Sequence, residues 1–181
     1  MRRRLGFLVS VAVLAGCGAA PVFERTGATP SVRLEFFAAD TVPDPSRHRM
    51  TQLERTDLIS SGGRPLYIDS LPVFTNVDVA KTRVVAFGDE VHRDEYAVEL
   101  TLTPSASARF AEFTQSWVGH PLAMLVEGKL VSAPFVQERI LGGKCQITVE
   151  GMGKEMVTRL AQGIVDTSSF RWPQPTVAPS P

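Results

Sequence analysis

The hydrophobic pattern is most regular between residues 96 and 164, where it predicts a folded unit. Residues 96–102 alternate between apolar and smaller or polar side chains, which is typical of a half-buried strand. Thr103 can cap a following helix, and Pro104 suits the first helical position because no N–H is needed there. Apolar residues then recur at helical spacing and form one stripe: Ala106, Phe110, Phe113 and Trp117. We expect this stripe to be core rather than a binding surface.

Beyond this helix the sequence predicts short strands, tight turns and a second helix. Strands are expected at 122–126 and 130–131, joined by Glu127-Gly128-Lys129 as a tight hairpin. Gly142 and Gly143 predict another turn before a strand at 146–149. The final helix carries its apolar residues on one side, as a helix that packs on a sheet does: Met152, Met156, Val157, Leu160, Ala161 and Ile164.

The first half of the chain has weaker patterns. Strands are expected at 32–37, 66–68 and 82–87, with a single helical turn at 76–79. The turn beginning at Gly88 returns the chain along residues 96–102, and short turns of this kind force antiparallel pairing. The sequence therefore predicts an α+β fold, in which an antiparallel or mixed sheet has two helices packed on one face as a two-layer sandwich.

The two ends of the chain have a different composition. Residues 1–17 hold Arg2, Arg3 and Arg4, then an apolar run, then small residues before Cys17, the layout of a secretory signal. We expect a flexible tether at 18–30, the folded domain at 31–170, and a Pro-rich disordered tail at 171–181.

The segment Leu14-Ala-Gly-Cys17 resembles the bacterial lipobox. This resemblance implies acylation of Cys17, including palmitate, and anchoring to the cell envelope with the domain facing the periplasm. Gly18 occupies the position where an aspartate would resemble inner-membrane retention, which favours the outer membrane in a Gram-negative cell. The alternative is an ordinary cleaved signal with a chance cysteine.

Composition narrows the range of functions. Of the 181 residues, 44% are hydrophobic and 21% are charged, as in ordinary globular proteins. Without the three leader arginines, 16 basic residues remain beside 19 acidic ones, which argues against a nucleic-acid partner. The two cysteines, Cys17 and Cys145, differ in setting and exclude a disulfide scaffold. We expect Cys145 to be a small buried side chain rather than a reactive thiol.

Residues 98–134, which contain VELTLTPSASARFAEFT followed by VGHPLAMLVEGKLVSAP, carry a second resemblance. Together with ILGGKCQIT at 140–148, they resemble the head subdomain in the first periplasmic domain of the SecD family. The resemblance covers residues 66–164 and is most specific at 127–134 with Gly142 and Gly143. SecD is an accessory subunit of the bacterial Sec translocation channel, and the resemblance implies that the head contacts translocating polypeptide.

The search for catalytic chemistry gives no site. Ser60, Ser61 and Ser132 lack the Gly-x-Ser-x-Gly elbow, and His48, His92 and His120 are far apart in sequence. A Ser/His/Asp site assembled in space remains the alternative that would make an envelope hydrolase. No metal, cofactor or catalytic residue is expected, because metal-ligand spacings and phosphate loops are missing and acidic neighbours of His92 are typical of a solvated hairpin tip.

The segment from Gly128 to Ile140 is the candidate binding region. Gly128, Gly142 and Gly143 are expected to serve turn geometry. The functional hypothesis is a protruding edge with apolar contacts from Val131, Ala133, Phe135 and Val136 and main-chain hydrogen bonds to a peptide. The residues proposed to bind a partner are Lys129, Val131, Ser132, Pro134 and Phe135. The resulting hypothesis is a non-enzymatic lipoprotein that binds unfolded secretory polypeptide or an envelope protein, with a structural scaffold lipoprotein as the alternative.

Overall fold

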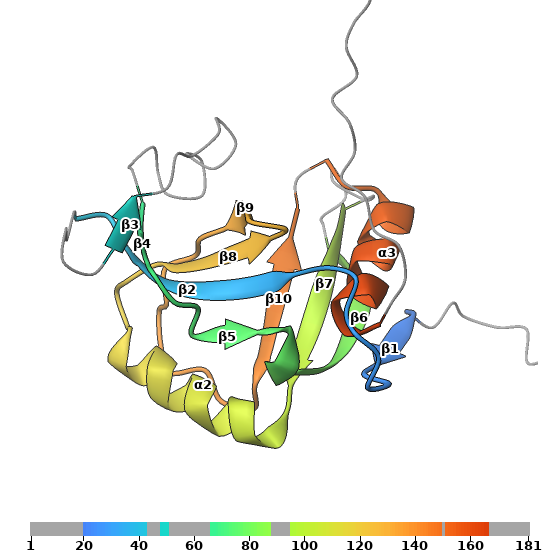
Figure 1. The fold of residues 1–181 in the computed structure, drawn as a ribbon, viewed down its shortest axis with the longest axis horizontal. Helices are drawn as coiled ribbons and strands as arrows, with labels where there is room; N and C mark the ends of the chain where they lie inside the picture. The colour runs from blue at the N-terminus through green and yellow to red at the C-terminus, as the bar shows by residue number, and fades with distance from the viewer. Residues whose placement is uncertain (1–19, 43–47, 51–65, 88–94, 150, 167–181) are drawn as a thin grey trace, which may run out of the picture.

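A computed structural model describes residues 20–42, 48–50, 66–87, 95–149 and 151–166 of the chain (Figure 1). Its strands form two antiparallel sheets. The first sheet has the order β1-β6-β7-β10. Its strands are β1 (Val22–Glu24), β6 (Val79–Phe87), β7 (Glu95–Leu102) and β10 (Lys144–Thr148).

The second sheet has the order β3-β4-β2-β8-β9, and a short strand β5 also pairs with β2. Its strands are β2 (Leu34–Asp40), β3 (His48–Met50), β4 (Tyr67–Asp69), β5 (Phe74–Thr75), β8 (Leu122–Val126) and β9 (Lys129–Ser132). The helical elements are the 3₁₀ turn η1 (Asn76–Asp78) and the α-helices α2 (Pro104–Ser116) and α3 (Lys154–Val165).

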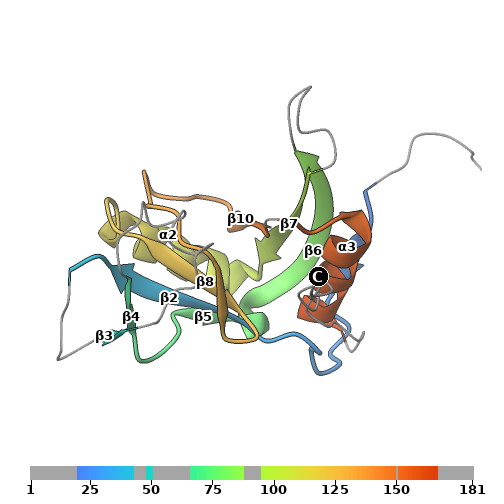
Figure 2. The ribbon, with the colours of Figure 1, turned by 90° about the horizontal axis from the view of Figure 1, so that it is seen from above.

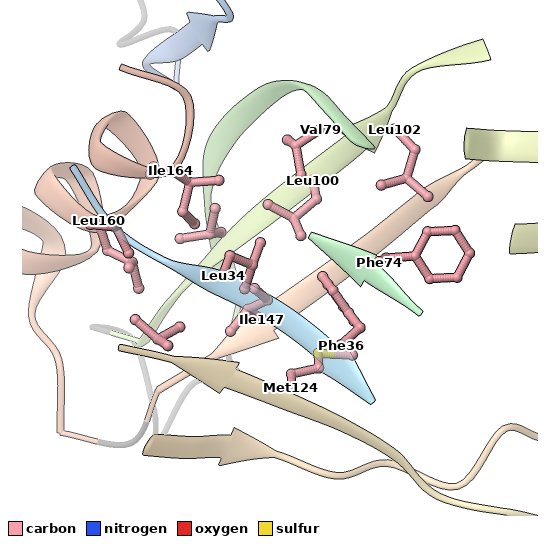
Figure 3. Packing of buried hydrophobic residues seen from close by; sticks show 14 of the residues in the cluster. Leu34, Phe36, Phe74, Val79, Leu100, Leu102, Met124, Ile147, Leu160 and Ile164 are labelled. Carbon is pink, nitrogen blue, oxygen red and sulfur yellow. The ribbon is translucent and has the colours of Figure 1, made fainter. Parts of the chain in front are cut away.

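The main hydrophobic core lies between the two sheets. In Figure 1, β2 crosses in front of β10, and Figure 2 shows from above that β2 and β8 lie to one side of β7 and β10. Alternate side chains of β2, β7, β8 and β10 meet in this core together with one face of α3 (Figure 3). The residues that meet here include Leu34, Phe36, Leu100, Met124, Ile147, Leu160 and Ile164.

A second, smaller core lies on the opposite face of the second sheet. There Phe37 and Ala39 of β2 pack with Ala123 and Leu125 of β8. Strand β8 is therefore buried on both faces, which explains why its five residues are apolar without alternation.

The α+β class and the antiparallel pairing are confirmed. The strands divide between two sheets rather than one, because β2 and β8 carry apolar side chains on both faces and need a layer on each side. Helix α2 begins as the sequence predicts: Pro104 is its first residue, and the Thr103 hydroxyl accepts a hydrogen bond from the Ala106 N–H at 3.3 Å. The helical turn expected near 76–79 is η1.

The expectation of a flexible tether at 18–30 is wrong for residues 22–24. These residues form β1, which pairs antiparallel with β6 and places Val22 opposite Arg83. The side chain of Phe23 packs against the main core, so apolar burial and main-chain hydrogen bonds together hold this segment on the sheet.

Asn76 joins segments that are distant in sequence. Its side-chain oxygen accepts a hydrogen bond from the Leu34 N–H at 2.8 Å, and its amide nitrogen donates to the Val32 carbonyl at 2.9 Å and the Ile164 carbonyl at 2.8 Å. One side chain thus holds the start of β2 against the end of α3.

Gly143 marks a close approach between the turn before β10 and helix α2. Its φ is +58°, and a Cβ there would lie 1.9 Å from the Ser107 Oγ. The neighbouring Gly142 also has positive φ, at +79°, but a Cβ there would meet nothing within 4 Å. Gly142 therefore needs only the backbone freedom of glycine, whereas Gly143 also needs the absence of a side chain.

Cys145 lies in β10 and packs, partly buried, against the main core. Desolvation by burial raises the pKa of its thiol to about 12. The thiolate, which is the nucleophilic form, is therefore scarce at neutral pH, as expected for a structural cysteine.

The substitution Asn76→Ala should destabilise the domain by about 3 kcal/mol, because it leaves one N–H and two carbonyls of the main chain without their partner. Asn76→Asp keeps the acceptor and loses both donors, so it should also destabilise the domain. The free energy of unfolding from urea titration tests this, and an Asn76→Ala variant as stable as the parent would contradict the role given to Asn76.

Gly143→Ala should lower the free energy of unfolding by about 2–5 kcal/mol, the sum of left-handed strain and overpacking against Ser107. Gly142→Ala is the matched control and should cost only about 1–2 kcal/mol, from strain alone. Equal urea midpoints for the two variants would show that Ser107 shifts at little cost, and would contradict the overpacking predicted for Gly143→Ala.

In a Cys17→Ala variant, Cys145 should react slowly with iodoacetamide at pH 8. With a pKa of about 12, only about one thiol in ten thousand is ionised, against about one in ten at the ordinary 9.0. Alkylation of the folded domain should therefore be about a hundredfold or more slower than in urea, and should rise about tenfold per pH unit up to pH 10. Mass spectrometry follows the reaction, and comparable rates in the two states would refute the shielding.

Candidate functional site

The candidate binding region begins at the hairpin between β8 and β9. Val126 pairs with Lys129, so the loop has two residues, Glu127 and Gly128, with φ of 52° and 76°. Two positive φ angles are typical of a type I′ turn, whose twist matches that of the strands. The Glu127 N–H also donates to the Arg33 carbonyl at 2.8 Å, and the Glu127 carboxylate accepts from the Arg33 N–H. The hairpin is thereby fixed to the residue that precedes β2.

From this hairpin the chain follows one edge of β8 over a long distance. Leu130 pairs with Leu125 and Ser132 with Met124, which leaves Val131 in an irregularity of the ladder. Pairing continues past the end of β9: the Leu122 N–H donates to the Pro134 carbonyl at 2.9 Å.

The next residues extend the same ladder. Phe135 forms a bridge with Pro121, and the Gly119 N–H donates to the Val136 carbonyl at 2.8 Å. Residues 129–136 thus form one extended segment, which we call the edge segment. Its outer side is the border of the second sheet, because β9 is the last strand in the order of that sheet.

All five residues predicted to bind a partner lie on the edge segment. Lys129 and Pro134 are exposed, whereas Val131, Ser132 and Phe135 are partly buried. Two of the apolar contacts expected from the sequence are not available: Ala133 is 0% exposed and Val136 is 5% exposed. Both side chains complete the two cores, so their apolar character reflects packing.

The chain beyond the edge segment is fixed to α2. The Thr114 hydroxyl, which is fully buried, donates to the Phe110 carbonyl at 2.8 Å and accepts from the Ile140 N–H at 2.9 Å. The close approach of Gly143 to Ser107 follows three residues later. The edge segment is therefore attached firmly at both ends, by the type I′ hairpin and by α2.

Aromatic side chains lie next to the edge segment, and sequence reasoning missed this arrangement. Phe113 and Trp117 stack with ring centroids 5.7 Å apart, and His120 lies 4.9 Å from Trp117. The Trp117 Nε1–H donates to the carbonyl of Pro121, the residue that bridges to Phe135, at 3.0 Å. The helical spacing of these residues was visible in the sequence, but the contact with the edge depends on the fold.

His120 also pairs with an acidic group. Its Nδ1 lies 3.3 Å from the Asp40 Oδ2. In the described part of the chain no serine hydroxyl joins this pair, and Ser132 lies on β9 opposite Met124. The structure therefore does not assemble a Ser/His/Asp site from Ser132. Ser60, Ser61, His92 and the side chain of His48 lie outside the described residues, as does Cys17.

The described ranges hold neither a cluster of metal ligands nor a helix that could span a membrane. Within them, no group of three or more histidine, cysteine, aspartate or glutamate residues is placed to hold a metal ion. Neither α2 nor α3, the α-helices of these ranges, has the length and apolar character needed to cross a membrane.

Comparisons with known proteins agree with the fold. Residues 50–163, more than half of the chain, match the family described as the SecDF P1 head subdomain. A solved structure of SecDF, described as a membrane component that enhances protein export, aligns with a TM-score of 0.54 at 23% identity. That alignment covers 77% of this chain and 64% of the other, and it supports the fold alone.

Two curated relatives are translocase subunits. The chain is 35% identical over 81 residues to protein translocase subunit SecDF of Thermus thermophilus, covering 45% of this chain and 10% of the relative. It is 33% identical over 93 residues to protein translocase subunit SecD of Acetobacter pasteurianus, covering 50% of this chain and 18% of the relative. The chain thus spans less than a fifth of each relative. On the family match, this chain belongs to the SecDF P1 head family.

Proposed function

We propose that this chain is a lipid-anchored envelope protein whose head domain binds extended segments of protein or peptide and assists protein translocation or envelope assembly. The observation that carries the proposal is the edge segment at residues 129–136, which borders the second sheet. An edge strand can accept an extended peptide through main-chain hydrogen bonds, while nearby side chains add apolar contact.

The partial burial of the edge segment and its attachment at both ends suit such a ligand. Val131 and Phe135 are partly buried, so each offers some apolar surface without leaving a large exposed patch. Trp117 is linked to the same ladder, because its Nε1–H donates to the carbonyl of Pro121, which bridges to Phe135. The attachment of the segment at both ends means that little backbone freedom would be lost when a peptide binds.

A role in protein export is supported by similarity to the two translocase subunits, SecDF and SecD. Those relatives are much longer than the part matched here, so their whole activity is not transferred. The match supports a head domain linked to protein translocation. In this proposal, the head contributes by contacting polypeptide outside the membrane.

The lipid anchor is supported by the sequence around Cys17, which resembles a lipobox. Two or more acyl chains are needed for stable attachment, since each buried CH₂ contributes only about 0.8 kcal/mol. In this proposal the anchor holds the domain on the periplasmic side of the envelope, with the outer membrane favoured by Gly18. The domain acts by binding, without catalysis, cofactor or metal.

A photoreactive amino acid in the full-length lipoprotein, crosslinked in cells, tests the binding proposal. Positions 129 and 137 flank the exposed side of the edge segment, and Arg159 on the exposed face of α3 is the matched control. We expect positions 129 and 137 to capture unfolded secretory chains or Sec components, and position 159 to capture few, because the backbone groups of α3 are hydrogen-bonded within the helix.

Membrane fractionation of each variant shows that the protein is exported and anchored. Capture of one unrelated envelope protein would mean a dedicated adaptor rather than an export factor. Equal capture from all three positions, or none from an anchored protein, would contradict the edge segment as a binding site and favour a structural scaffold.

A further inference from the structure

Strand β1 begins very close to the proposed lipid anchor. Only five residue steps separate Cys17 from Val22, the first residue of β1. A fully extended chain spans at most about 3.3–3.6 Å per residue, so the two residues can be no more than about 18 Å apart. The acylated cysteine would therefore lie close to the part of the domain to which β1 is attached.

β1 is held firmly on the first sheet. The Val84 N–H donates to the Pro21 carbonyl at 3.1 Å, and the Arg25 N–H donates to the Ala80 carbonyl at 2.9 Å, one at each end of the strand. The Arg25 side chain also donates to the Asn76 carbonyl at 2.6 Å. Peeling β1 away would break these bonds and expose Phe23, so the sheet stays near the anchor.

The surface at this edge combines apolar and basic groups. Val22 is 52% exposed and Val77, in the turn contacted by Arg25, is 66% exposed. Register places Val22 opposite Arg83, and the exposed Lys81 lies on the same outer face. Two carboxylates lie there as well: Glu24 opposite Lys81, and Glu99, which pairs with Arg83 at 2.9 Å. The charges at this edge therefore nearly cancel. Exposed valines beside polar side chains of nearly balanced charge suit the interfacial region of a bilayer, where apolar groups are buried and charged ends stay in water.

The opposite end of the domain carries a comparable exposed valine. β2 starts near α3, where the Ser31 N–H donates to the Gly163 and Asp166 carbonyls, and then runs away from β1 (Figure 1). Val42, two residues past the end of β2, is 65% exposed. At roughly 3.3 Å per residue, β2 alone spans about 20 Å, so Val42 lies far from the start of β2.

We propose that the β1 edge of the first sheet, with Val22, Lys81 and Arg83, rests on the lipid surface and gives the domain a fixed orientation. This inference rests on the lipid anchoring proposed above. The end of the domain with β3, β4 and Val42 then points away from the bilayer. Because the connection from Cys17 to β1 is short, the anchor restricts the orientation of the domain as well as its distance from the membrane.

The test compares Val22→Cys with Val42→Cys in the full-length lipoprotein. Both carry Cys145→Ser, so that only the introduced thiol takes a small fluorophore, while Cys17 is acylated. The proteins are reconstituted into vesicles of phosphatidylethanolamine and phosphatidylglycerol that contain a headgroup-attached quencher. The probe at position 22 should be quenched strongly and the probe at position 42 weakly.

The control inserts a linker of 20 Gly and Ser residues between Gly18 and Ala19, which adds a mean span of about 25 Å. The difference between the two probes should be lost in this variant. Equal quenching of both probes without the linker would overturn the orientation while leaving the anchor intact. Failure of the parent protein to float with vesicles would overturn the anchor itself, and crosslinking from the edge segment tests peptide binding separately.

Discussion

The turn η1 is the junction on which the arrangement of the two sheets depends. Asn76 holds the start of β2 and the end of α3 through three hydrogen bonds. Two residues later, the buried Asp78 accepts from the Thr75 N–H at 2.9 Å and pairs with Arg109 of α2. Its carbonyl accepts from the Thr103 N–H, at the start of the same helix. One turn thus connects the second sheet, which β5 joins, to the first, which β6 joins. Unsatisfied polar groups at such a junction would be costly, so its geometry is narrowly defined.

The candidate site follows from how this junction organises the second sheet. With β2 held against α3, both faces of β8 are covered by core, and β2 occupies one of its edges. The edge segment occupies the other edge and forms the border of the second sheet. Because Ala133 and Val136 are buried, neither side chain can touch a ligand, and the apolar area that the segment can offer a partner is smaller. The chain just beyond the segment is hydrogen-bonded to α2 through Ile140 and Thr114.

The sequence predicts best what local chemistry decides. The hairpin at Gly128, the cap at Thr103 and the paired glycines before β10 each depend on residues within a few positions. The contacts of Asn76 cross 42, 44 and 88 residues, and β1 pairs with a strand almost 60 positions away. Contacts between residues so far apart produce no periodic pattern in the sequence. For the same reason the sequence pattern identified Phe113 and Trp117 as one stripe with Ala106 and Phe110, but could not show that they lie beside the edge segment.

The chemistry of the edge segment favours a partner of varied sequence over one fixed ligand. Main-chain hydrogen bonds from a sheet edge do not depend on the side chains of the peptide they hold. Specificity would need pockets for alternate side chains, and here the inward positions are already occupied by Ala133 and Val136. The partly exposed side chains of Val131 and Phe135 would offer apolar contact that many segments can meet. An extended chain entering from either direction would find the same backbone edge. This combination suits transient contact with unfolded chains better than a permanent complex, because little of the affinity would come from one defined side chain.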